Sequence, residues 1–240
     1  MKNINWNNKE EVLEEVKKDG SKLILASKEL KNDFDVVMEA VKNFSWCIED
    51  AGEKARDNKD IIKEVLKRNS TYIEYASDRL RDDDEIMGIA LEKDHWNLRF
   101  ASDRFKDNKD LVMSLIKKCS GVVKYASPRL RNDIDIIKEC IKEYGTSVFQ
   151  YTNDEIRDNK EIMLEAIKVT GFNIQYASDR LRNDEELLKI AFNTCSWAFE
   201  YAGDKIKEKY NSADDFYNKK IKDDLWIDKV SSDKDNQRER

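Results

Sequence analysis

Apolar residues in this chain follow a spacing that places them on one face of an α-helix. They stand at i, i+1, i+4 and i+5 with charged residues between them, whereas a strand would need alternation. The spacing predicts a series of amphipathic helices of about ten residues each. Two of the clearest stripes are Ile61, Ile62, Val65, Leu66 and Ile136, Ile137, Cys140, Ile141.

The helical stripe returns with a period of about 25 residues. Tyr75-Ala76-Ser77-Asp78-Arg79-Leu80-Arg81-Asp82-Asp83 is echoed from Tyr125 and again from Tyr176, and degenerate copies begin at Ala26, Ala51, Ala101, Thr152 and Ala202. A fixed short period is typical of a stack of units that bury their apolar faces against one another. The pattern therefore predicts an all-α fold, an α-solenoid of about eight 25-residue two-helix repeats. Positions are numbered below from the alanine of the Tyr-Ala-Ser phrase.

Polar residues mark where the helices of each repeat begin. Position 7 is always Asn or Asp and position 10 is always acidic, so we expect position 7 to cap the main helix in a capping box. Ser or Gly near position 20 ends this helix, and Ser is expected to cap a shorter one with apolar residues at positions 21, 23 and 25. The residues at position 7 are Asn32, Asp57, Asp82, Asp107, Asn132, Asp158 and Asn183.

The ends of the chain depart from the period, as terminal caps of repeat arrays do. We expect a single array over residues 1–230, with an N-terminal cap at 1–25, seven full repeats at 26–201 and a C-terminal cap at 202–230. Residues 9–19 supply the opening helix, and Ser212-Ala213-Asp214-Asp215 predicts a capping box for a final helix. Leu225, Trp226 and Ile227 are expected to fold back as a lid. Residues 231–240 contain no apolar side chain and are expected to be disordered.

Composition narrows the classes of function. The net charge of −6 and pI of about 5.2 argue against a general polyanion binder. The start of the chain shows no secretory signal and no apolar run of bilayer length. The four cysteines fill apolar slots without a C-x-x-C pair, which predicts a reducing compartment and a cytoplasmic location. The cysteines are Cys47, Cys119, Cys140 and Cys195.

A basic ladder is the main candidate binding feature. Position 6 is Lys or Arg in every repeat, and the best-formed repeats supply a candidate partner-binding set of Arg81, Lys106, Arg131, Arg157 and Arg182. Such a stripe suits an acidic peptide or a nucleic-acid backbone. The alternative, which the recurring acids at positions 3 and 10 favour, is local pairing within the array. Position 4 adds Arg79, Arg104, Arg129 and Arg180 to the candidate stripe.

An aromatic ladder at position 25 has two interpretations as well. Its rings could stack bases, but they precede a small alanine on an apolar face, so core packing is the better interpretation. The ladder consists of Tyr75, Phe100, Tyr125, Tyr151, Tyr176 and Tyr201.

Catalysis has little support in the sequence, so we expect no enzyme. His95, the one histidine, holds the slot where serine stands elsewhere, which indicates capping or exposure. There is no phosphate-binding loop, dinucleotide fingerprint or zinc motif, and no cofactor or metal ion is expected.

The Tyr-Ala-Ser-x-x-Leu-Arg-x-Asp phrase resembles a family of short tandem helical repeats of unknown function that is found in bacterial and protist proteins. The resemblance covers about residues 20–208, and its clearest departures are Thr152-Asn153 and Ala55. It implies an all-helical fold and brings no activity and no catalytic residue.

The sequence favours a non-enzymatic scaffold for a protein or peptide partner, with no membrane contact. Position 24 varies between repeats and is free to carry recognition. The alternatives are a single-stranded nucleic-acid reader, which the acidic charge disfavours, and a purely structural spacer.

Overall fold

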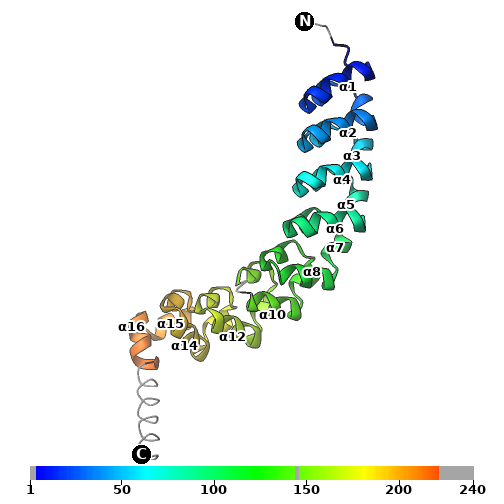
Figure 1. Cartoon of the computed structure of the whole chain (residues 1–240). Coiled ribbons are helices and arrows are strands. Elements are labelled where there is room, and N and C mark those ends of the chain that lie inside the picture. The colour runs from blue at the N-terminus through cyan, green and yellow to red at the C-terminus, as the bar shows by residue number, and fades with distance from the viewer. Residues whose placement is uncertain (1–3, 144–145, 222–240) are drawn as a thin grey trace, which may run out of the picture. The chain divides into compact units, whose positions relative to one another are not determined.

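The computed structural model describes residues 4–143 and 146–221, and within those ranges every regular element is helical. The predicted all-α repeat solenoid is confirmed. The chain divides into two compact units, Met1–Ser127 and Pro128–Arg240, each of which is a stack of repeats (Figure 1). The two units are described separately below.

Each repeat contains the two predicted helices and, after them, a single helical turn. A long α-helix is followed by a six-residue 3-10 helix and then by a single helical turn that leads into the next repeat. The long helices are α1 (Lys9–Lys18), α2 (Phe34–Asn43), α4 (Lys59–Arg68), α6 (Asp84–Lys93), α8 (Lys109–Ile116), α10 (Ile134–Lys142), α12 (Lys160–Val169) and α14 (Glu185–Thr194). The 3-10 helices are η1 (Gly20–Leu25), η3 (Ser45–Asp50), η4 (Ser70–Tyr75), η5 (His95–Phe100), η6 (Ser120–Tyr125), η7 (Thr146–Tyr151), η8 (Gly171–Tyr176) and η9 (Ser196–Tyr201). The single turns are η2 (Leu30–Asn32), α3 (Glu53–Arg56), α5 (Asp78–Arg81), α7 (Asp103–Lys106), α9 (Pro128–Arg131), α11 (Asp154–Arg157) and α13 (Asp179–Arg182).

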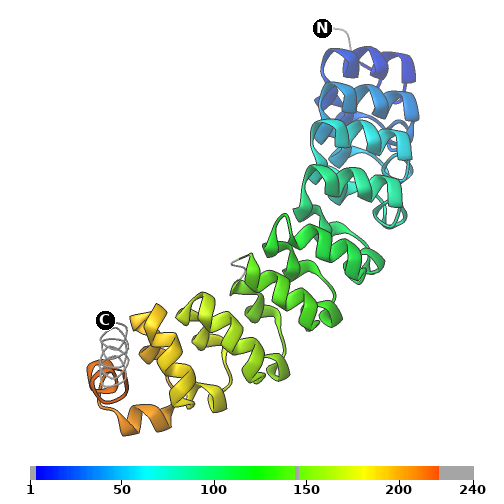
Figure 2. The same cartoon turned by 60° about the horizontal axis from the view of Figure 1, so that its bottom comes forward.

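Two layers of helices sandwich the core in each unit. In the first unit each of the helices α1, α2, α4 and α6 packs against the next one, and Figure 2 shows them stacked one after another. The 3-10 helices η1, η3, η4, η5 and η6 pack in a second row. The second unit repeats this arrangement with α10, α12 and α14 and with η7, η8 and η9. The apolar stripes lie between the layers, and all four stripe residues of α4 are completely buried.

The cap of each long helix lies one residue later than predicted. Position 8, not position 7, accepts the free backbone N–H groups: Asp83 accepts from Glu85 and Ile86 at 3.0 Å each. Asn58 and Asn159 do the same at the start of α4 and α12. Position 10 is therefore the second residue of the helix, where its carboxylate still lies in the positive first turn.

Position 20 does not cap the 3-10 helix as expected. The residue before it does, and Asp94 for example accepts from the Trp96 N–H at 2.9 Å. Position 20 is Gly or Ser in most repeats because the repeats approach closely there, and His95 is an exception. A Cβ on Gly171 would lie 1.9 Å from the Ala191 carbonyl oxygen of the next long helix.

Position 7 joins one repeat to the next, which is the reason that it is not the cap. Asp57 accepts a hydrogen bond from the Ser77 hydroxyl and one from Arg79 Nε at 2.9 Å. The Arg79 guanidinium also donates to the Asp57 carbonyl oxygen at 2.6 Å. We call this arrangement the aspartate joint. It recurs at Asp82 with Ser102 and Arg104, and at Asp158 with Ser178 and Arg180.

A different set of residues forms the joint where position 7 is asparagine. Asn183 Oδ1 accepts the Lys205 N–H at 3.0 Å, and its amide donates to the Asp179 carbonyl. Position 2 of the next repeat is then Gly203, because a Cβ there would lie 2.3 Å from the Asn183 side chain. Asn32 and Gly52 repeat this asparagine joint.

A backbone hydrogen bond underlies both kinds of joint. At most joints the N–H at position 2 donates to the carbonyl at position 6 of the preceding repeat, whereas at the Asn132 joint the Asn153 N–H donates to Asn132 Oδ1 at 2.7 Å. Examples are Ser178 to Arg157 at 3.0 Å and Gly203 to Arg182 at 2.9 Å.

Consecutive repeats also alternate in their polar residues. Every second long helix begins with an Asn-Lys pair, and in α1, α4 and α12 the lysine reaches the cap aspartate of the following helix. Lys9 lies 2.9 Å from Asp33, and Lys59 lies 2.9 Å from Asp83. The larger structural period is thus a doublet of two repeats.

The ends agree with prediction where the structure describes them. The opening helix is α1, and Ser212 caps α16 (Ala213–Phe216) by accepting the Asp215 N–H at 3.1 Å. Helix α15 (Asp204–Lys209) lies between the last repeat and α16, and the π-helix η10 (Tyr217–Ile221) follows α16. The predicted lid and the 231–240 tail fall outside the described residues.

One kind of joint should be convertible into the other only when the residue at position 7 and its partners at positions 2 and 4 of the next repeat are replaced together. Asp158→Asn alone should lower the melting temperature, because Ser178 and Arg180 lose their charged acceptor. Adding Ser178→Gly and Arg180→Lys should restore much of the loss by rebuilding the asparagine joint, less the roughly 0.5–1 kcal/mol that glycine costs in backbone entropy. Thermal melts by circular dichroism measure both steps. A triple variant less stable than Asp158→Asn would show that the glycine and lysine do not rebuild an asparagine joint at this position.

The aspartate joints should also make stability depend on pH. The pKa values of Asp57, Asp82 and Asp158 are lowered, first by the serine hydroxyl bond and then by the arginine. A carboxylate with a depressed folded-state pKa stabilises above its unfolded pKa, and the effect is lost as pH falls through the folded value. Urea midpoints should therefore be level above about pH 5 and fall below about pH 4. The triple variant, with one joint fewer to titrate, should fall less steeply.

Candidate partner-binding surface

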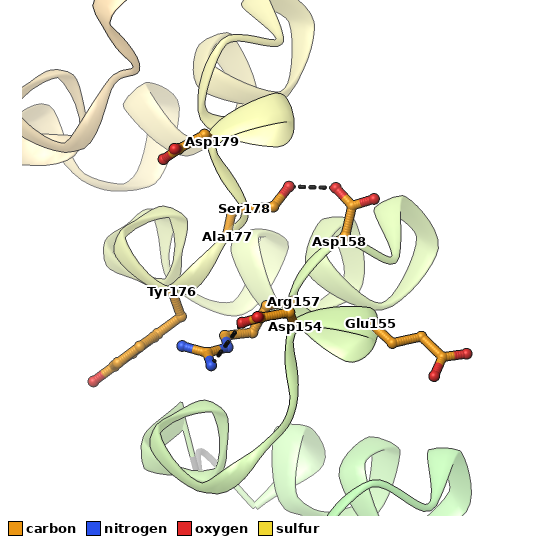
Figure 3. Close-up of a pocket in the computed structure, with 8 residues that line it drawn as sticks. All are labelled: Asp154, Glu155, Arg157, Asp158, Tyr176, Ala177, Ser178 and Asp179. Atoms are coloured by element: carbon orange, nitrogen blue, oxygen red, sulfur yellow. Dashed lines mark hydrogen bonds and ion pairs between the residues drawn. The ribbon is translucent and has the colours of Figure 1, made fainter.

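A hollow recurs where the single turn of one repeat meets the start of the next repeat. In the second unit it lies between α11 and the end of η8 with the residues that follow, and its volume of about 630 Å³ is typical of ligand clefts. Figure 3 shows its lining: Asp154, Glu155, Arg157, Asp158, Tyr176, Ala177, Ser178 and Asp179. Equivalent hollows in the first unit lie between η2 and α3, between α3 and α5, and between α5 and α7.

The joints place ladder cations in each of these hollows: Arg157 in the hollow of the second unit, and two in each hollow of the first unit. The bond from position 2 to the carbonyl of position 6 brings the cation beside the aromatic ring at position 25. The guanidinium of Arg56, for instance, lies 5.8 Å from the centre of the Tyr75 ring. In Figure 3 Arg157 and Tyr176 project from the two sides of the same hollow.

The structure pairs three of the five candidate ladder residues with local acids. Arg157 lies 3.0 Å from Asp154, and Arg81 and Arg182 contact Asp78 and Asp179 in the same i,i+3 arrangement. These arginine side chains are 30–37% exposed, so their stems pack against the array while their charged ends reach the hollow. The local-pairing interpretation is correct for these three.

Lys106 and Arg131 differ from the other three. Among the described residues neither has an ion pair, and Pro128 stands where the acid would precede Arg131. Arg81 and Lys106 belong to the first unit, whereas Arg131, Arg157 and Arg182 belong to the second. A role of the five in binding a partner stays a prediction.

The arginines at position 4, which the sequence pattern adds to the candidate stripe, hold consecutive repeats together. Arg79, Arg104 and Arg180 hold aspartate joints. A signal for this was present in the sequence. Wherever position 7 is aspartate, serine and arginine follow 20 and 22 residues later, and wherever it is asparagine they do not.

The rings of the aromatic ladder are half-buried and none of them belongs to the fully buried core, whereas a second set of rings is exposed. Position 21 on the 3-10 helices carries Trp46, Trp96, Phe172 and Trp197, with exposed fractions of 41%, 37%, 43% and 71%. Some of these rings pack edge-on against the position 25 tyrosine of the next repeat, as Phe172 does on Tyr201 at 5.4 Å. Sequence reasoning treated position 21 as core and missed this surface.

Nucleophiles and metal ligands do not converge in the described residues. Burial raises the pKa of the Cys47 and Cys140 thiols to about 12, so both are protonated at neutral pH. His95 is half-buried with Nδ1 2.9 Å from the Leu91 carbonyl oxygen, and Asp94 takes the capping role expected of it. No group of His, Cys, Asp and Glu in the described part of the chain could hold a metal ion. Nor does that part contain a helix long and apolar enough to cross a membrane.

Comparison with known proteins gives a family and nothing further. The family model described as "Domain of unknown function (DUF4116)" matches residues 8–54, 58–106, 108–157 and 159–207. No curated protein and no solved structure matches the chain.

The four matches begin at Asn8, Asn58, Asn108 and Asn159, the asparagines that precede the lysine of each doublet. The family's repeat is therefore the doublet, about twice the 25-residue unit predicted from the apolar pattern. Because the four tandem matches cover most of its length, the chain belongs to the DUF4116 family.

Proposed function

We propose that this protein is a non-enzymatic repeat scaffold of a reducing, cytoplasmic compartment that binds a protein or peptide partner along its hollows. The observation that supports this most is repetition. A hollow with a similar layout, containing at least one ladder cation and usually one half-buried ring, recurs at successive joints. Helical arrays characteristically bind extended partners over such repeated surfaces.

The layout of the hollows favours binding over catalysis. An enzyme needs one place where chemically different groups converge. Here each hollow is open to solvent and has nearly the same lining as its neighbours, and the buried thiols lie elsewhere. A partner that occupies several equivalent hollows would gain a small binding free energy from each of the neighbouring repeats.

A protein partner is favoured over a nucleic acid by the acids in the hollows. The hollow in Figure 3 contains four carboxylates, from Asp154, Glu155, Asp158 and Asp179, and one arginine. Phosphates would meet that repulsion at each step, and the net charge of −6 adds to it. A peptide can instead offer both a carboxylate for the cation and N–H donors for the acids.

The decisive first experiment is affinity capture from the source cell, with and without nuclease treatment. Protein captured equally well in both samples supports the proposal. Capture that nuclease abolishes would support the nucleic-acid alternative. No specific capture by the folded full chain would favour a structural spacer.

Charge reversal in the second unit tests the hollows themselves. Arg131→Glu with Arg157→Glu should weaken binding of the captured partner by about tenfold, equal to about 1.4 kcal/mol. Added salt should weaken wild-type binding as well, because these charges are partly exposed. The fold should survive, since losing the exposed Arg157–Asp154 pair costs less than about 1 kcal/mol.

The matched control reverses the same amount of charge away from the hollows. Lys118→Glu with Lys168→Glu alters two exposed lysines at the ends of long helices and should leave affinity unchanged. Titration calorimetry and circular dichroism melts are run on all three proteins. A destabilised Arg131/Arg157 variant with wild-type affinity would remove the ladder from the binding surface.

A further inference from the structure

The 3-10 helices η5 and η6 of the first unit form a surface that is both basic and aromatic. Their sequences, His-Trp-Asn-Leu-Arg-Phe and Ser-Gly-Val-Val-Lys-Tyr, contain no acid. Residues i and i+3 of a 3-10 helix lie on the same face. Trp96 therefore shares a face of η5 with Arg99, and Gly121 shares a face of η6 with Lys124.

Contacts between the two helices join these side chains into one patch. The Trp96 ring lies over Gly121, where an added Cβ would be 2.8 Å from a ring carbon. Trp96 packs edge-on against Tyr125 at 6.1 Å, and Lys124 Nζ lies 4.9 Å from the Trp96 ring and 4.8 Å from the Tyr125 ring. Glycine at position 21 of η6 thus leaves room for the outer edge of the Trp96 ring.

Arg99 extends the patch toward a hollow. Its guanidinium lies 4.4 Å from the Phe100 ring, and both residues line the hollow that also contains Lys106. Of the two candidate ladder residues in the first unit, Arg81 is paired with Asp78, whereas Lys106 has no ion pair among the described residues. We define the η5–η6 patch as Trp96, Arg99, Phe100, Lys124 and Tyr125.

The neighbouring part of the same row has the opposite charge. The 3-10 helices pack in the order η3, η4, η5, η6, and position 24 is Glu49 on η3 and Glu74 on η4. Asp50 ends η3 and adds to this charge. One continuous row in the first unit thus changes from acidic to basic between η4 and η5.

We propose that the η5–η6 patch docks an acidic stretch of an extended peptide segment belonging to a partner protein. This rests on the scaffold function proposed above and names the chemistry of its partner. Packed helices lie about 8–10 Å apart and an extended chain advances about 3.3–3.6 Å per residue, so one repeat corresponds to about three peptide residues. Carboxylates about three residues apart would meet Arg99 and Lys124 in turn.

A peptide suits this surface better than single-stranded RNA. Stacking of a base needs a free ring face. Lys124 and Arg99 already cover faces of Trp96, Tyr125 and Phe100. An RNA that continued along the row would carry phosphates toward Glu74 and Glu49, whereas a peptide can change its charge there.

Selection from a library of random dodecapeptides displayed on phage tests the proposal with the full chain. Peptides selected by the wild type should be enriched in Asp and Glu over the starting library, with acids recurring at a spacing of about three residues. Arg99→Glu with Lys124→Glu should abolish the enrichment. The matched control, Glu49→Lys with Glu74→Lys, changes the same position on the acidic part of the row and should keep it.

Affinity of one selected acidic peptide gives the second readout. By fluorescence anisotropy, Arg99→Gln with Lys124→Gln should weaken it about 2- to 30-fold, as the loss of two exposed ion pairs implies. This neutral variant also replaces the charge reversal if that variant fails to fold by circular dichroism. Acid enrichment that survives in the charge-reversed protein, or no acid enrichment with the wild type, would overturn the proposal.

Labelled U12 RNA separates the other outcomes. RNA that binds the wild type more tightly than the selected peptide, and loses affinity in the same variants, would overturn the peptide assignment. A partner captured from the cell that depends on Arg131 and Arg157 but not on Arg99 and Lys124 would also overturn it, while leaving the scaffold function intact.

Discussion

The rest of this structure depends on the joint between consecutive repeats, in which the N–H at position 2 donates to the preceding repeat, at most joints to the carbonyl at position 6. A helix of ten residues is too short to be stable alone in water and has only one apolar face to bury. Stacking supplies the second surface, and the joint fixes how the next repeat is placed. It thereby determines where the long helices meet, where the hollows form and which 3-10 helices lie side by side.

The chemistry of the joint limits which polar residues can occur together. An aspartate at position 7 needs the serine and arginine that arrive more than 20 residues later, as Asp158 needs Ser178 and Arg180. Asn32 and Asn183 instead face a glycine, because a Cβ on Gly52 or Gly203 would clash with the asparagine side chain, and Asn132 accepts the Asn153 N–H directly. Much of the 39% of charged residues therefore serves assembly. The doublet arises in the same way, since the lysine of one long helix neutralises the cap of the next.

The apolar pattern was sufficient to predict the helices, the stacking and the short period, because every repeat buries the same slots. It could not show that position 8 is the cap, since positions 7 and 8 are both Asx in every full repeat and only contact with the next repeat distinguishes them. The apolar pattern does not reveal the doublet, because alternate repeats differ only in polar residues such as Lys59 and Asp83, which form an ion pair. Local pairing of Arg157 followed from Asp154 three residues earlier. The exposure of Trp96 did not follow from spacing, because it depends on Gly121 in another repeat.

A repeat protein whose regular polar groups hold its joints must carry recognition in groups that break the regularity. Serine and arginine of the aspartate joints are occupied, and three of the five candidate ladder cations are paired with a local acid. The departures are what remain: Pro128 in place of the acid before Arg131, glycine in place of a large residue at position 121, and a position 24 that changes sign along one row. Each departure costs the array little, because none of these side chains supports a joint. A surface built from them can therefore vary between members of such a family while the solenoid beneath it stays the same, which is why the fold of this chain is so much easier to infer than its partner.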